Sequence, residues 1–109
     1  MQDEEDFLNA QSQINQELAT AMIEATPENW NAIKLEIEQE NVNGNIAIKH
    51  KISSPEGHDD LIMATDEIIS ATSKLSFLFE SNNKPWKKVE CLTAQNNEGN
   101  WSIECQFTY

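Results

Sequence analysis

Asn43-Gly44 lies between two stretches of alternating side chains, and this arrangement constrains the fold more than any other feature of the sequence. Asparagine and glycine both tolerate the positive φ angles of a two-residue type I′ turn, which joins antiparallel strands. The register set by such a turn gives one apolar face and one face of opposite charges. Its pairs are Leu35 with Ile52, Ile37 with His50, Glu36 with Lys51, and Glu38 with Lys49. Residues 30–53 are therefore predicted to form a β-hairpin.

A second hairpin is predicted for the last part of the chain, where Pro85-Trp86 opens a strand over roughly residues 86–94. Apolar and polar side chains alternate from Trp101 to Tyr109, which is typical of a strand with one buried face. A turn centred on Glu98 sets the register of this hairpin. Its facing pairs are Val89 with Phe107, Cys91 with Cys105, and Thr93 with Ile103.

Helical periodicity precedes each hairpin. Residues 2–25 repeat apolar side chains at intervals of four and seven, and Thr26-Pro27 ends this pattern because proline does not accept a preceding helical turn. Residues 53–61 read as a polar loop, and residues 63–81 as a second helix with a broad apolar surface. The apolar positions are Phe7, Ile14, Leu18, Ala21, Met22 and Ala25, then Ile68, Ile69, Thr72, Leu75, Phe77, Leu78 and Phe79.

The resulting element order is helix, strand, strand, helix, strand, strand. We expect an α+β fold in one domain, residues 1–109, with a four-stranded antiparallel sheet and both helices on one face. The other sheet face would mix both signs of charge, and the acidic surplus would lie at residues 3–6, Glu17, Glu24 and residues 56–60. The mixed face comprises Lys34, Glu36, Glu38, Lys49, Lys51, Lys88, Glu90, Glu104 and Gln106.

The charge balance restricts the class of partner. The chain has 19 acidic residues, seven lysines and no arginine, for a formal net charge of −12. Phosphate backbones repel such a surface, so direct binding of nucleic acid is not expected, and basic proteins are the expected partners. No apolar stretch approaches the roughly 18 residues of a membrane span. The acidic beginning of the chain is unlike a secretory signal and favours the cytoplasm.

The residues that could support chemistry are few. His58-Asp59-Asp60 resembles a metal-ligand cluster or a base–carboxylate pair, but a metal site needs further ligands, so a solvated polar loop is favoured. His50 is expected at the edge of the core, with pH sensing as the alternative. Cys91 and Cys105 face each other. Because facing Cβ atoms lie about 4.5–5.5 Å apart and a disulfide needs about 3.8 Å, two free buried thiols are favoured over a disulfide. The sequence predicts no enzyme activity, no cofactor and no metal.

The chain resembles the YezG-like immunity proteins, which protect bacteria from polymorphic toxins and contact-dependent growth inhibition. That family has a Pro-x-x-Trp motif after its first helix, a tryptophan opening its third strand, and a closing glycine–aromatic pattern ending in x-Ile-x-Phe-x-Tyr. The corresponding segments here are Pro27-Glu28-Asn29-Trp30, Pro85-Trp86-Lys87-Lys88-Val89, and residues 99–109. The resemblance implies a cytoplasmic antitoxin that binds its cognate toxin domain directly, often a nuclease.

The favoured hypothesis is an immunity protein that occludes the active or substrate-binding site of a basic toxin, since a carboxylate-rich surface can mimic phosphate. The candidate contacts lie in a flexible loop and along the first hairpin: Glu56, Asp59, Asp60, Glu36, Glu38 and Glu40. The alternative is an acidic secretion-type chaperone that binds a segment of an effector by strand addition or in a groove.

Overall fold

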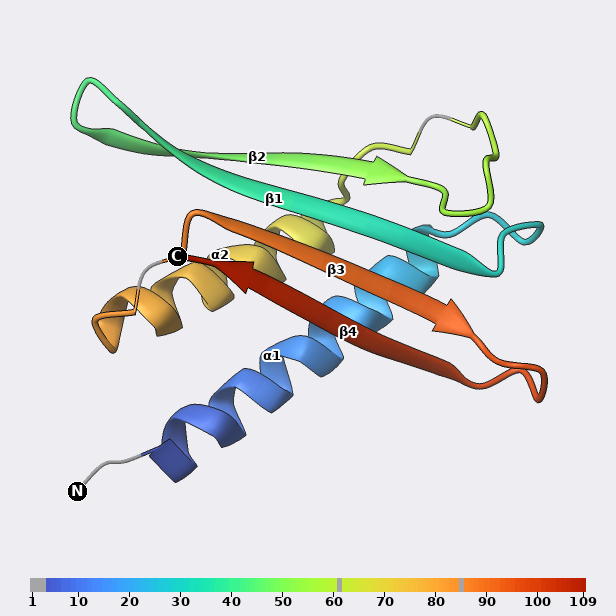
Figure 1. The fold of residues 1–109 in the computed structure, drawn as a ribbon, viewed down its shortest axis with the longest axis horizontal. Coiled ribbons are helices and arrows are strands. Elements are labelled where there is room, and N and C mark those ends of the chain that lie inside the picture. The colour runs from blue at the N-terminus through green and yellow to red at the C-terminus, as the bar shows by residue number, and fades with distance from the viewer. Residues whose placement is uncertain (1–3, 61, 85) are drawn as a thin grey trace.

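The computed structural model describes residues 4–60, 62–84 and 86–109, and within them the chain forms two helices and one four-stranded sheet (Figure 1). The α+β fold and the element order predicted from the sequence are confirmed. The elements are α1 (Glu4–Ala25), β1 (Ala32–Val42), β2 (Asn45–Ser53), α2 (Asp66–Ser81), β3 (Lys88–Gln95) and β4 (Trp101–Thr108).

The sheet has the order β2-β1-β3-β4, and all three strand pairs are antiparallel. Asn43 and Gly44 have φ angles of 55° and 84°, as the type I′ turn requires. The predicted registers of both hairpins are confirmed, with Ile37 opposite His50 and Cys91 opposite Cys105. Pairing of β1 with β3 joins the two hairpins into a single sheet.

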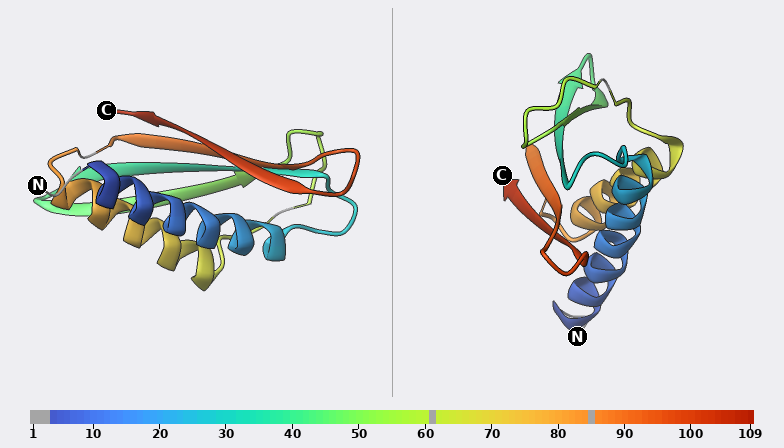
Figure 2. Two further views of the ribbon diagram at one scale, coloured as in Figure 1. Left: turned by 90° about the horizontal axis from the view of Figure 1, so that it is seen from below. Right: turned by 90° about the vertical axis from the view of Figure 1, so that its right-hand side faces the viewer.

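Both helices lie on the same face of the sheet (Figure 2). The core forms between the two layers, and its largest members are fully or almost fully buried. Burying one aliphatic or aromatic side chain of this kind contributes about 1.5–3 kcal/mol, so these residues supply much of the driving force for folding. They are Leu18 and Met22 of α1, Ile68, Leu75 and Phe79 of α2, Ile33, Leu35, Ile37 and Val89 of the sheet, and Trp30 and Trp86 of the connections.

The second helix begins later than the sequence pattern suggested. It was predicted to start at residue 63, but α2 starts at Asp66 because Thr65 caps it, with Oγ1 accepting a hydrogen bond from the amide of Ile68 at 3.2 Å. The apolar surface of the helix is also narrower than predicted. Phe77 is 73% exposed, since the buried stripe follows the helical period through Ile68, Thr72, Leu75 and Phe79 and leaves Phe77 outside it.

The first helix ends where the sequence predicted, whereas the third strand starts two residues later than predicted. The first helix ends at Ala25, and the Thr26 hydroxyl donates to the carbonyl of Met22 at 2.6 Å. The third strand starts at Lys88 rather than at residue 86, because Trp86 packs into the core before the ladder begins. Residues 2 and 3 of the predicted first helix, Leu61 of the predicted loop and Pro85 lie outside the described residues.

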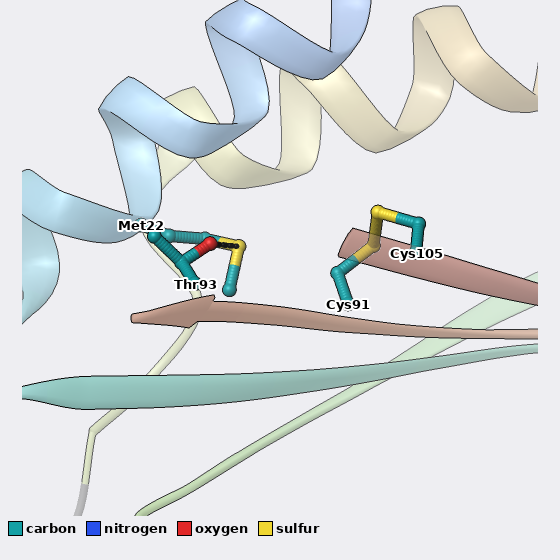
Figure 3. Close-up of a disulfide and its surroundings, with 4 residues drawn as sticks. All are labelled: Met22, Cys91, Thr93 and Cys105. Atoms are coloured by element: carbon teal, nitrogen blue, oxygen red, sulfur yellow. Dashed lines mark hydrogen bonds between the residues drawn. A yellow bond between two sulfur atoms is a disulfide. The ribbon is translucent and has the colours of Figure 1, made fainter. Parts of the chain in front are cut away.

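The expectation of two free thiols was wrong, because Cys91 and Cys105 form a disulfide between β3 and β4 (Figure 3). Their Cα atoms lie 4.1 Å apart. That is close to the roughly 4.5 Å of the narrower, non-hydrogen-bonded class of antiparallel pair, in which side chains approach more closely than the average spacing implies. The same figure shows Thr93 beside Met22, where the hydroxyl lies 3.5 Å from the thioether sulfur.

We expect this disulfide to stabilise the fold by about 3 kcal/mol, the entropy effect of closing a loop of roughly 15 residues. Urea unfolding of the wild type with and without a dithiol reductant measures the contribution. Cys91→Ala/Cys105→Ala should unfold at the lower denaturant concentration under both conditions. A wild type whose midpoint does not respond to reductant would contradict the expectation.

Candidate functional site

The loop that contains three of the predicted partner-binding carboxylates is fastened to the beginning of β1. The Glu56 carboxylate accepts a hydrogen bond from the backbone amide of Asn31 at 2.7 Å and one from its Nδ2 at 3.3 Å. The Asp60 carboxylate accepts from Trp30 Nε1 at 3.1 Å. The His58 ring stacks on Trp30, with ring centroids 5.6 Å apart. Glu56 and Asp60 therefore hold the loop in place.

These contacts also affect ionisation. The hydrogen bonds from Asn31 are the main reason that the pKa of Glu56 lies below its usual value, and the nearby His58 ring lowers that pKa further. Such a carboxylate stays ionised at neutral pH and is already engaged by its own chain. All three predicted carboxylates of this loop are exposed, and Asp59 differs from the other two in that it does not accept a hydrogen bond from Trp30 or Asn31.

The predicted contacts on β1 lie on the sheet face that the helices leave open, and lysines interleave them. Lys34 Nζ lies 3.6 Å from Glu36 and 4.0 Å from Glu90, so it bridges two carboxylates that face each other across β1 and β3. Lys49 pairs with Glu40 at 3.1 Å. Glu38 has a lysine opposite it on both neighbouring strands. The predicted mixed-charge face is thus present, and its charges largely offset one another.

Lys88 and Glu90 show the same balance. Their side chains lie 3.1 Å apart, and this contact is the main cause of a raised pKa for Lys88 and a lowered pKa for Glu90. Lys34 lowers the pKa of Glu90 further. Each group favours the charge of the other, so little uncompensated negative potential is left at this point of the sheet.

A groove of about 830 Å³ runs between α1 and α2 on the side away from the sheet, and we name it the helix groove. Its carboxylates are Glu17 and Glu24 of α1 and Asp66 and Glu67 of α2, and its one cation is Lys74, which donates to Glu17 at 2.9 Å. The other lining residues are Gln13, Gln16, Thr20, Ala21, Ser70 and Ala71. The helix groove therefore keeps an uncompensated negative charge.

Small side chains explain why the helix groove exists. Ala21 and Ala71 are 5% and 2% exposed where the two helices meet. An alanine at such a contact does not fill the space between helices, so longer polar side chains form walls around a shallow floor. The sequence pattern had assigned part of the acidic surplus to Glu17 and Glu24. It missed Asp66 and Glu67 as their neighbours, because the pairing of the two helices is a tertiary contact.

His50 lies on the inner face of β2, as the hairpin register predicted. Its Nε2 lies 2.8 Å from Oγ1 of Thr72, and that hydroxyl donates to the carbonyl of Ile69 at 3.0 Å. The hydroxyl proton is therefore used, and Nε2 is the donor in the contact. Partial burial holds the pKa of His50 below its usual value.

Replacing Glu56 should loosen the loop, because it removes both acceptors for Asn31. In Glu56→Ala we expect amide hydrogen exchange over residues 54–60 to accelerate by about fivefold, in proportion to the lost hydrogen bonds. Asp59→Ala is the matched control, since it removes a carboxylate of the same loop that does not bind Asn31. Equal exchange in the two variants would show that Glu56 does not hold the loop.

Protonation of His50 should destabilise the protein. Because its pKa is lower folded than unfolded, its contribution to stability is complete above about pH 6.5 and is lost as the pH falls through the folded-state pKa. The free energy of unfolding of wild type should therefore fall more steeply between pH 7 and pH 5 than that of His50→Gln. Parallel pH profiles for the two proteins would refute this assignment.

Within the parts of the chain that the structure describes, no helix is long and apolar enough to cross a membrane. In the same ranges, no group of three or more histidine, cysteine or acidic side chains is arranged to hold a metal ion. No protein-family model and no curated protein matches this chain.

Proposed function

We propose that this protein is an immunity protein that binds a cationic toxin domain stoichiometrically and blocks its active or substrate-binding site. The observation that carries the proposal is the separation of charge between the two faces. Carboxylates on the open sheet face alternate with lysines, whereas the helix groove has four carboxylates and one lysine. A net charge of −12 is thus expressed mainly on the helix side.

The chemistry of a nuclease fits this surface. Such an enzyme must hold a polyanion, so its cleft is lined with basic side chains that a row of carboxylates can occupy in place of phosphates. Opposite charge also accelerates encounter, up to about 10⁸–10⁹ M⁻¹s⁻¹ at low salt. The resemblance to YezG-like immunity proteins supports the same class of partner, a basic toxin domain that acts in the cytoplasm.

The positions of the potentially reactive side chains support binding rather than catalysis. His50 is bonded to Thr72, and the His58 ring is stacked on Trp30. Cys91 and Cys105 are consumed in the disulfide. Each of these residues has a structural role, and among the described residues no histidine or cysteine lines the helix groove.

Neutralising the helix groove should weaken toxin binding. The test protein is the product of the gene immediately upstream, which the proposal expects to end in a basic domain, and the variant carries Glu17→Gln, Glu24→Gln, Asp66→Asn and Glu67→Gln. We expect the association rate constant at low salt to fall by about tenfold or more, because steering depends on these charges. In wild type the rate should also fall as salt rises.

The matched control removes the same number of carboxylates from the open sheet face, through Glu36→Gln, Glu38→Gln, Glu40→Gln and Glu90→Gln. Circular dichroism and thermal melting establish that both variants fold. A larger loss of binding in the sheet-face variant would move the interface to the β1 residues predicted from the sequence. Absence of a complex between wild type and the neighbouring product would refute the proposed function.

A further inference from the structure

The outer edge of β4 presents unused backbone hydrogen-bonding groups. In the order β2-β1-β3-β4 this strand is terminal, and no strand of the described residues pairs with its outer side. The Thr108 carbonyl accepts from the amide of Lys87 at 2.7 Å, so it faces inward. Because backbone groups of alternate residues point to the same edge, the N–H and C=O groups of Ile103, Cys105 and Phe107 point outward.

The two edges of the sheet differ in their protection. Natural edge strands are commonly guarded by lysine, proline or a bulge. β2 carries Lys49 and Lys51 on the open sheet face. In contrast, β4 contains neither lysine nor proline and has one charged residue, Glu104. Glu104 is exposed, and no lysine of the described residues forms an ion pair with it. β4 is therefore the open edge.

Apolar surface accompanies the open backbone. Ile103 and Phe107 of β4 stay partly exposed, although Val89 and Cys91 on the neighbouring strand β3 are fully buried. The side chains of Ile103 and Phe107 are therefore left partly uncovered at the edge of the sheet, and an additional strand beside β4 would bury them further.

The first helix extends the floor of this incomplete edge. The N-terminal turns of α1 reach beyond β4 in the plane of the sheet (Figures 1 and 2). Leu8, which is 58% exposed, lies about four turns before Met22 on the same side of α1, and Met22 contacts Thr93 of β3. Leu8 is therefore on the side of α1 that faces the sheet, within the N-terminal turns that extend beyond β4 (Figure 1).

We propose that the outer edge of β4 binds an extended segment of the cationic partner by strand addition, with apolar and basic side chains alternating along that segment. Its apolar side chains would lie over Leu8, Ile103 and Phe107, and its basic side chains would lie on the open sheet face beside Glu104. A second copy of this chain is disfavoured as the occupant, because each copy carries a net charge of −12. The inference rests on the proposed function only for the charge of the partner.

A synthetic peptide tests the edge without the partner. The probe is a capped nine-residue peptide that alternates valine and lysine, and its control carries N-methyl groups on the valines, which removes the donors that would face β4. At saturating probe we expect amide exchange at Ile103, Cys105 and Phe107 to slow by about tenfold or more, with little change at Glu104 and Gln106, which face β3. Equal protection by the N-methylated peptide would mean charge attraction alone and would overturn the proposal.

Variants of β4 give a second readout. Ile103→Pro removes one outward amide and Ile103→Ala keeps it, so the proline variant should bind the probe more weakly than the alanine variant. Glu104→Lys should weaken binding by about tenfold, while Glu98→Lys makes the same change of charge in the turn and should have little effect. If the exchange of the outward amides in free protein depends on its concentration, a second copy occupies the edge and the proposal is wrong.

The peptide and the groove variants separate this inference from the proposed function. The variant with a neutralised helix groove should still bind the probe at β4, even if it no longer binds the toxin. A probe that fails to protect β4, while the groove variant still loses toxin binding, would refute strand addition alone.

Discussion

Antiparallel pairing of β1 with β3 is the interaction on which the rest of the structure depends. It joins two hairpins that each follow a helix, and it places both helices on one face of a single sheet. The apolar residues of all six elements can then share one core, in which α1, α2 and β4 meet through Phe7, Phe79 and Phe107. Without this pairing, each hairpin would expose its apolar face to water.

The same layered arrangement separates the charges. Strands alternate their side chains between two faces, so lysines and glutamates that are neighbours in the sheet offset one another on its open side. The helices present their polar sides to solvent, and their carboxylates have fewer cations nearby. The folded protein therefore has an uneven electrostatic field, and such a field can orient a cationic partner before contact.

The open edge of β4 contrasts with the rigidity of the strand itself. The Cys91–Cys105 disulfide lies in the middle of β4 and ties it to β3. A strand held in register presents its outward backbone groups with little further loss of conformational freedom, which lowers the entropic cost of adding another strand. The disulfide to β3 and the unpaired outer edge of β4 therefore both favour the proposed strand addition.

The sequence by itself determined the two hairpin registers and the element order, because turn residues and the period of side-chain alternation are local properties that admit few solutions. It also determined that acidic surfaces would dominate. Only the tertiary structure decided which carboxylates stay available, since Glu56 and Asp60 are engaged by Asn31 and Trp30, residues distant along the chain. The disulfide was likewise decided by packing, because a difference of less than about 1 Å in the distance between two facing strands determines whether the thiols can join. The tertiary structure also decided that Glu17 and Glu24 share a groove with Asp66 and Glu67, because the approach of two helices over alanines is not encoded in any single segment.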